Sequence, residues 1–442
     1  MPSDADPKLE ELLDKAPFVG LPLLVSVLTA LAVVFDGFDI QAIAFVAPSL
    51  MQEWGIDRAG LAPVLAAGLI GMALGALLVG NLGDRLGRRR ALIGCLVLIA
   101  VASWASAFAE NATQMTGLRL LTGVGLGGVL PNATALIVEF SPRRVRNLVV
   151  AVTIVGVPIG GMVGSMAAAT VIPVLGWQAV FLIGAVLPAM LAGAMWIWLP
   201  ESPRFLATRP ARRAELQRLV AALSPGATVG QGVDPVVETG APGVRALLVP
   251  DYRRETLLIW TIFVTNIFSV YCFFNWTPTI LAGQGLDLGT ALRGAMTFNL
   301  GGVVGSIVGA WIMNRLGSRP VLLTLGLVGA LSTVSIGLAL DMASGELRLM
   351  YAAIALAGAC ISGIQVQMYT VASLAYPTAI RSTGVGWATG MARLGGIASS
   401  YAGPLFLALG SGTLPFFSGV AIVLLITWVA MVLLRSHLPA EA

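Results

Sequence analysis

Long apolar runs, separated by short polar segments, dominate this chain of 442 residues. About 20 residues of apolar helix cross the hydrocarbon core of a bilayer, and twelve runs reach that length. The pattern therefore predicts an all-α membrane protein with twelve transmembrane helices. We expect these spans at about 20–48, 60–82, 91–109, 113–140, 147–173, 176–199, 255–282, 290–314, 320–340, 347–375, 381–409 and 412–435.

The two halves of the chain repeat each other. GDRLGRRRAL from Gly83 matches MNRLGSRPVL from Met313, and SPRRVR from Ser141 likewise matches YPTAIR from Tyr376. The spacing between the two members is nearly the same for both matches. Parallel repeats of this kind occur in transporters whose two six-helix halves enclose a central substrate site. The repeat predicts that architecture here.

Polar segments divide the chain further. We expect an N-terminal tail (1–19), a first six-helix half (20–199), a central loop (200–254), a second half (255–435) and a C-terminal tail (436–442). All but five of the 26 Lys and Arg residues fall on the side that holds both tails and the central loop, so the positive-inside rule makes that side cytoplasmic. Within the loop, PESPRFLATRPARRAELQRLVAAL predicts an amphipathic helix, and the Gly/Pro-rich stretch after it predicts a flexible linker.

Composition excludes several classes of protein. With 57% hydrophobic and 11% charged residues, the chain is not a soluble globular protein, which carries about 25% charged residues. One histidine, His437, and three cysteines in apolar runs leave no Ser/His, Cys/His or metal-ligand cluster. We therefore expect neither an enzyme nor a cofactor or metal. Any proton carrier inside the membrane must be a carboxyl group.

Two aspartates interrupt the first apolar run, in LAVVFDGFDIQAIAFVAPSL from Leu31. Asp36 and Asp39 are three residues apart and would lie on nearly the same face of a helix. A charged group at the bilayer centre costs about 2.5–3.5 kcal/mol on insertion scales, so the presence of both aspartates requires a structural or functional explanation. Two explanations stay open: a buried ion pair that holds the bundle together, or a face that takes up and releases protons.

Two arginines complete the charges within the predicted spans. Arg119 lies at about the same depth in span four as Asp39 does in span one, so we expect the two to meet. A static ion pair needs only one aspartate, so the second aspartate argues for a proton site. Arg119 would adjust the pKa of this site, and Asp39 is the favoured proton carrier. Arg393 lies near the middle of span eleven with no acidic residue at that depth in the second half. Its planar fork matches a carboxylate, which predicts an anion site. The alternative is a partner in span one or among backbone carbonyls.

Polar and aromatic residues supply weaker candidates for contacts with a substrate. On span seven, Tyr271 and Asn275 are four residues apart, with Asn266 deeper in the span. Gln365 and Tyr369 are spaced in the same way on span ten, and Phe38 lies between the two aspartates. Each one alone is more typical of packing, whereas the set suits an amphipathic ligand that carries a ring.

Three loop motifs resemble those of the major facilitator superfamily. GNLGDRLGRRR, from Gly80, has the pattern G-x-x-x-D-R-x-G-R-R of its loop between spans two and three. EFSPRRVR, from Glu139, and PESPR, from Pro200, resemble motifs of its sugar-porter-like members. The resemblance implies that cytoplasmic ion pairs latch the two halves and break as they rock. It gives this gating role to the loop residues Asp84, Arg85, Arg88, Glu139 and Arg146.

A narrower resemblance joins these motifs to DGFD and APSL in span one and to WTPTIL at the end of span seven. Together they look like the aromatic acid/proton symporter family. This implies that Asp36 and Asp39 are needed for proton-coupled uptake of a benzoate-like or hydroxybenzoate-like acid. The predicted protein is a monomeric transporter of the bacterial inner membrane, with a small organic anion and the bilayer as partners and no nucleic acid.

Four other functions stay open. The alternatives within transport are a proton-coupled sugar or polyol importer, a symporter of another organic acid and an efflux antiporter. A sugar site would use Gln and Asn in place of a midplane arginine. A transport-inactive nutrient sensor is the alternative of another class, and it would usually need a long cytoplasmic tail.

Overall fold

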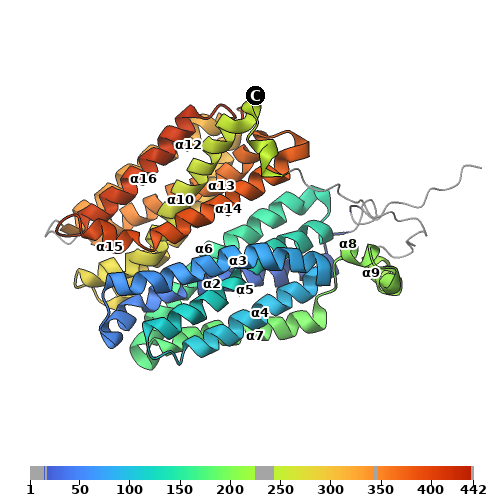
Figure 1. The fold of residues 1–442 in the computed structure, drawn as a ribbon, viewed down its shortest axis with the longest axis horizontal. Helices are drawn as coiled ribbons and strands as arrows, with labels where there is room; N and C mark the ends of the chain where they lie inside the picture. Colours follow the sequence, from blue (N-terminus) through green and yellow to red (C-terminus); the bar gives the residue numbers. More distant parts are fainter. Residues whose placement is uncertain (1–13, 15–16, 224–242, 342–346, 440–442) are drawn as a thin grey trace, which may run out of the picture.

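The computed structural model describes residues 14, 17–223, 243–341 and 347–439, and it is built from helices (Figure 1). The first half comprises α2 (Leu21–Trp54), α3 (Arg58–Leu86), α4 (Arg88–Ser106), α5 (Ala112–Phe140), α6 (Arg143–Leu175) and α7 (Gln178–Trp198). The second half comprises α10 (Pro250–Gly283), α11 (Leu288–Leu316), α12 (Ser318–Asp341), α13 (Leu347–Leu374), α14 (Thr378–Ser399), α15 (Ala402–Leu407) and α16 (Leu414–Leu433). The predicted all-α fold with two helical halves is confirmed.

The eleventh predicted span differs from the others. Eleven helices of the described chain are long and apolar enough to cross a membrane, and α14 is not one of them. The run expected at 381–409 is divided between α14 and the short helix α15, with a turn at Ser400 and Tyr401. Two arginines and several glycine, serine and threonine residues lower the hydropathy of α14. Its packing against α10 and α3 places this polar helix between the two halves.

The central segment is not the single amphipathic helix that the sequence predicts. It forms α8 (Pro203–Ala207), the 3-10 turn η1 (Pro210–Arg212) and α9 (Arg213–Leu223). Proline has no backbone N–H and therefore starts a helix more readily than it continues one, which explains the break at Pro210. A further turn, η2 (Val244–Leu247), precedes α10. The Gly/Pro-rich stretch expected as a linker falls on residues 224–242, outside the described residues.

The internal repeat extends to the close contacts between helices. A Cβ on Gly160 of α6 would lie 1.9 Å from the carbonyl oxygen of Val34 on α2. A Cβ on Gly395 of α14 would lie 2.0 Å from the carbonyl oxygen of Val264 on α10. The two glycines, and likewise the two valines, are spaced along the chain as the matched sequence motifs are. Small residues let membrane helices approach closely, and here they fix the same α2–α6 and α10–α14 crossing in each half.

The two halves are close at one end of the molecule and diverge toward the other, where α8 and α9 lie (Figure 1). Gln41 of α2 and Asn299 of α11 hydrogen-bond across the halves, and α3 contacts both α14 and α15. A Cβ on Gly283 at the end of α10 would lie 3.1 Å from the Arg58 guanidinium at the start of α3. We call this the closed end and the opposite one the basic end.

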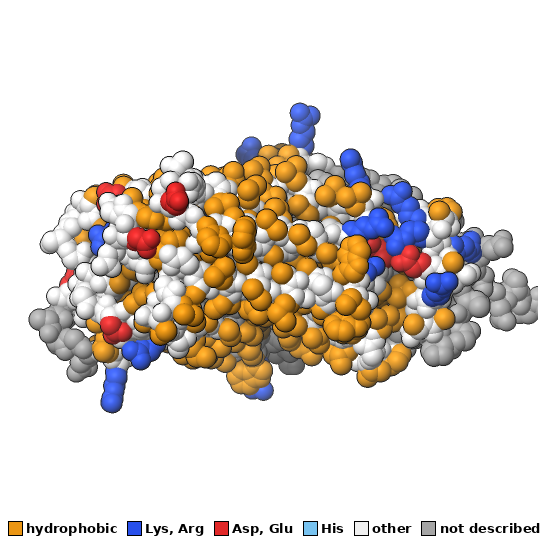
Figure 2. All heavy atoms as spheres, turned by 90° about the horizontal axis from the view of Figure 1, so that it is seen from below, with side chains coloured by type: hydrophobic (Ala, Val, Ile, Leu, Met, Phe, Trp, Pro, Cys, Tyr) orange, Lys and Arg blue, Asp and Glu red, His pale blue; other side chains and the backbone are white. Residues whose placement is uncertain are grey.

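The distribution of hydrophobic and charged side chains on the surface changes between the closed end and the basic end. Hydrophobic side chains cover the middle of the face shown in Figure 2, and Lys and Arg side chains gather toward the end that carries α8 and α9. An apolar belt between polar ends is the surface of a helical protein that lies in a bilayer.

Candidate functional site

Asp39 is held in a buried ion pair inside the first half. The Arg119 Nη1 lies 3.0 Å from the Asp39 Oδ1, and Nη2 donates to the Asp39 backbone carbonyl at 2.8 Å. Ser103 of α4 donates to the second carboxylate oxygen at 2.8 Å. Asp39 and Arg119 are each 1% exposed. The contact expected from their matching depth is therefore present, with Ser103 as an additional partner.

Asp36 lies one turn away from Asp39 and has a different environment. Its side chain is buried, and its Oδ1 has no hydrogen-bond partner among the described residues. The cation that acts on it electrostatically is Arg393, on α14 of the other half. Among the described residues no ion pair joins Asp36 directly to Arg393. The two charges therefore lie on different halves, within electrostatic range of each other.

Three of the predicted ligand contacts gather with Arg393. Tyr271 of α10 interacts with Arg393 through its charge and through a side-chain hydrogen bond, and it is within electrostatic range of Tyr369 of α13. Tyr369 also packs edge-on against Phe263, with ring centroids 5.3 Å apart. Gln365, one turn from Tyr369, accepts a hydrogen bond from Asn266 at 2.9 Å. The second half thus supplies a cation, two phenols and two amides.

The other two predicted contacts lie elsewhere. Asn275 donates to Ser399 at 3.3 Å and, with Arg119 from the other half, lines a small cavity of about 10 Å³. The Phe38 ring points toward the positions of Gly164 on α6 and Gly184 on α7, where it fills the space that these glycines leave. We therefore do not include Phe38 among the ligand contacts below.

The sequence reasoning missed the amide pair that joins the halves. Gln41 Nε2 donates to Asn299 Oδ1 at 3.2 Å, and Asn299 Nδ2 donates to Gln41 Oε1 at 2.9 Å. Both side chains are buried, and a Cβ on Gly161 would lie 1.9 Å from Gln41 Nε2. The available signal was a glutamine two residues after Asp39 in an apolar run, because an amide in that setting needs a partner.

Three of the five predicted gating residues meet at the basic end. Arg88 lies 3.4 Å from Asp84 and 3.2 Å from Glu139, and Glu139 also accepts a hydrogen bond from Ser202 just before α8. Glu139 is buried, whereas the Asp84 side chain is 69% exposed. The Asp84 pair is therefore well solvated, and the Glu139 contacts anchor the central segment to the first half.

The remaining two gating residues make other contacts. Arg146 donates to the Ser141 carbonyl at 3.1 and 3.2 Å and lies 3.7 Å from Asp14. Arg85 is exposed, and its backbone carbonyl accepts a hydrogen bond from Arg209. Each of the contacts described for the five residues stays within the first half, its N-terminal segment and the central segment. Their proposed latch to the second half therefore stays a prediction.

Glu201 of the PESPR motif has a role that sequence reasoning did not assign. Its buried carboxylate accepts a hydrogen bond from the Arg89 backbone N–H at 3.0 Å, in the first turn of α4. Gly87, with φ of 103°, forms the preceding turn, and a Cβ there would lie 2.2 Å from Glu201 Oε2. A carboxylate at a helix N-terminus satisfies a free amide and the helix dipole. Asp84, in the same loop, pairs with Arg88.

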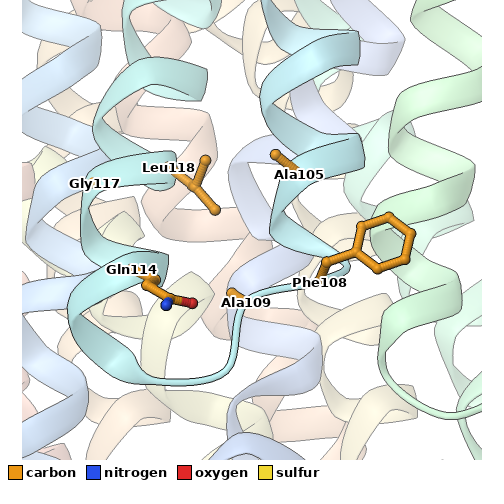
Figure 3. Close-up of a pocket in the computed structure, with 6 residues that line it drawn as sticks. All are labelled: Ala105, Phe108, Ala109, Gln114, Gly117 and Leu118. Atoms are coloured by element: carbon orange, nitrogen blue, oxygen red, sulfur yellow. The ribbon is translucent and has the colours of Figure 1, made fainter.

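A larger pocket is unrelated to these charges. It measures about 340 Å³, opens at the corner between α4 and α5, and belongs to the first half alone. Figure 3 shows its lining residues: Ala105, Phe108, Ala109, Gln114, Gly117 and Leu118. With one polar side chain and no charge, it offers little to recognise an anion. Within the described residues no group of three His, Cys, Asp or Glu side chains could hold a metal ion.

A sequence model of the Major Facilitator Superfamily matches residues 29–345 of the chain. The chain belongs to this superfamily. The gallate transporter of Pseudomonas putida is 38% identical over 414 residues, which cover 93% of this chain and 91% of that protein. The 4-hydroxybenzoate transporter PcaK of the same species is 35% identical over 406 residues, covering 91% and 90%. Within the superfamily, the chain belongs to the aromatic acid/proton symporter family, as its motifs predict. The protein is thus a transporter and not an enzyme.

A solved structure supports the fold of this family member. The xylose transporter XylE from E. coli, in a partially occluded inward-open conformation, superposes with a TM-score of 0.75. The match covers 96% of this chain and 99% of that one at 15% sequence identity. At that identity the likeness concerns the helical architecture alone, and it says nothing about the substrate.

Proposed function

We propose that this protein imports an aromatic carboxylate together with protons across the bacterial inner membrane by alternating access. The observation that carries the proposal is the pair Asp36 and Arg393, which lie on different halves within electrostatic range of each other. No ion pair joins them among the described residues. A guanidinium binds a carboxylate in a bidentate way, so Arg393 suits the carboxylate of a substrate. The relatives named for gallate and 4-hydroxybenzoate support an aromatic acid.

We assign the transported proton to Asp36, although the sequence favours Asp39. Asp39 is bound by Arg119 and Ser103, and protonation would sacrifice a buried ion pair. The Asp36 Oδ1 is buried and finds no hydrogen-bond partner in the described part of the chain. An isolated buried carboxylate is poorly solvated, and a proton relieves that cost. In this assignment, Asp39 and Arg119 fix the α2–α5 geometry that positions Asp36.

The proposed orientation places the basic end in the cytoplasm. The basic loops and central segment lie there, as the positive-inside rule requires. The contacts at the closed end, Gln41–Asn299 and Arg58 beside Gly283, then form the external gate. In this orientation, the described arrangement releases substrate to the cytoplasm.

The transport cycle follows from charge neutralisation. In the outward-facing state, Asp36 takes up a proton and Arg393 binds the carboxylate of the acid. Both charges between the halves are then compensated, which removes the main electrostatic cost of closing the site. After the halves rock, the higher cytoplasmic pH draws the proton from Asp36. The carboxylate of Asp36 then competes with the substrate for Arg393 and favours its release.

The test compares three variants in proteoliposomes. Asp36→Asn removes the proton site while keeping the shape of the side chain. It should abolish uptake that is driven by an imposed proton gradient and retain exchange of internal for external substrate. Arg393→Met should abolish binding of the acid. Glu110→Gln, which neutralises an exposed acid, is the control and should transport normally. Gradient-driven accumulation by Asp36→Asn at the wild-type level would refute the assignment.

A further inference from the structure

Two buried polar atoms on neighbouring side chains of the second half have no hydrogen-bond partner among the described residues. They are Oδ1 of Asn266 on α10 and Nε2 of Gln365 on α13. Asn266 is 0% exposed, and Gln365 is partly buried. A buried polar atom without a hydrogen-bond partner costs folding free energy, and such atoms are rare in native structures. The two atoms therefore require an explanation.

The contacts of the two amides fix which atoms remain free. The Ile361 carbonyl oxygen can only accept, so the group of Asn266 that faces it at 3.1 Å must be the NH₂. The same NH₂ donates to Gln365 at 2.9 Å, so the group of Gln365 that receives it must be the carbonyl oxygen. Reversing either amide would set like groups against each other. The free atoms are therefore one acceptor, on Asn266, and one donor, on Gln365.

A hydroxyl group satisfies this combination, because it donates one hydrogen bond and accepts others. We propose that Asn266 and Gln365 form a subsite for a hydroxyl on the aromatic ring of the substrate. The transporter then selects hydroxylated aromatic acids over the unsubstituted acid. This inference rests on the proposed function and names the substrate class within it.

The position of the pair relative to Arg393 fits such a ligand. Tyr271, which hydrogen-bonds with Arg393, is five residues beyond Asn266 on α10, a rise of about 7.5 Å. Asn266 and Tyr271 are thus separated along the helix by about the length of a benzene ring that carries a carboxylate at one edge and a hydroxyl at the opposite edge. Tyr369, one turn from Gln365, packs against Phe263 and adds aromatic surface beside the amide pair.

The internal repeat places Asn266 where the first half has Asp36. The two residues have the same spacing along the chain as Val34 and Val264, which match in the two helix crossings. Asn266 thus occupies on α10 the register position that Asp36 occupies on α2. Both unpaired atoms are covered by protein in this structure, so a hydroxyl reaches them when Gln365, the partly exposed member, rotates. The new hydrogen bonds replace the one lost between the amides.

The test uses benzoate and 4-hydroxybenzoate, which differ by one hydroxyl. Their dissociation constants would be measured by calorimetry on purified protein. Wild type should bind 4-hydroxybenzoate at least about tenfold more tightly, because the unsubstituted ring leaves both atoms unpaired. Asn266→Leu and Gln365→Met should each reduce this ratio to within about threefold of unity, mainly by weakening 4-hydroxybenzoate. Gln367→Met is the matched control: this buried glutamine bonds to Ser306, and its loss should leave the ratio unchanged.

Each other outcome has a definite meaning. Equal affinities of wild type for the two acids would overturn the subsite and leave the proposed function standing. Variants that weaken both acids by the same factor would show that the amides only support the fold. If wild type bound neither acid, the proposed function itself would fail. Melting temperatures of the variants in the absence of ligand separate weakened binding from incomplete folding.

Discussion

The amide pair Gln41–Asn299 makes a quantitative prediction about the closed end. Gln41→Met keeps the length of the side chain and removes its amide. Asn299 would keep its own bond to the Ala295 carbonyl but lose both bonds to Gln41. Its carbonyl oxygen would then be buried and unpaired for as long as the two halves touch. Separation of the halves would expose it to water.

The expected effect follows from that difference. A buried polar group without its partner costs about 1–3 kcal/mol, and the cost falls only on the state in which the halves are closed here. Gln41→Met should therefore shift the equilibrium toward opening of this end by about 5- to 150-fold. Asn299→Leu should act in the same direction. The double variant leaves no unpaired amide and should lie near wild type.

The assay is a distance measurement between spin labels across the closed end. Ala59 at the start of α3 and Gln284 just after α10 are exposed and belong to different halves. The native cysteines Cys95, Cys272 and Cys360 are buried and would be replaced before labelling. Each single variant should increase the population at long distance, and the double variant should reverse that increase.

Additive effects of the two single variants on the opening of this end would refute the reasoning. If the double variant opened this end as much as the two single variants combined, pairing of the amides would not be what closes it. Gln367→Leu is the matched control, because this glutamine is equally buried but bonds within the second half. It should leave the distance distribution unchanged.

Three further predictions concern packing and the C-terminal tail. Arg119→Met should destabilise the protein by about 3–5 kcal/mol, because the buried Asp39 carboxylate loses its cationic partner. The melting temperature should fall, and adding Asp39→Asn should restore part of the lost stability. Gly160→Ala should reduce the folded yield, since its Cβ would lie 1.9 Å from a carbonyl oxygen of α2, whereas Gly193→Ala, with open space around it, should not. Burial and a nearby arginine lower the pKa of His437, so the docked tail prefers the neutral ring and its docking should weaken as pH falls below about 6.5. A spin label on the tail should become more mobile between about pH 7.5 and 5.5, and His437→Gln should remove that change.

The fold was predictable from the sequence because a bilayer restricts the alternatives. Backbone polar groups must be satisfied within each segment, so apolar runs of sufficient length become helices. The regular spacing of the matched motifs then implies two equivalent halves, and the glycine contacts of α6 and α14 bear this out. The breaks at Pro210 and after α14 were less visible, because local hydropathy does not mark where a helix is interrupted.

The sequence by itself also identified the costly charges Asp36, Asp39, Arg119 and Arg393, because a charge inside a membrane is rare enough to stand out. The sequence alone could not decide which of these charges form a structural ion pair and which carry the proton or bind the substrate. That depends on neighbours from distant helices: Ser103 and Arg119 enclose Asp39, whereas Asp36 faces the other half. Uncharged partners such as Gln41 with Asn299 and Asn266 with Gln365 carry little signal in a sequence. Only tertiary structure determines whether an amide is paired, and so only tertiary structure reveals these contacts.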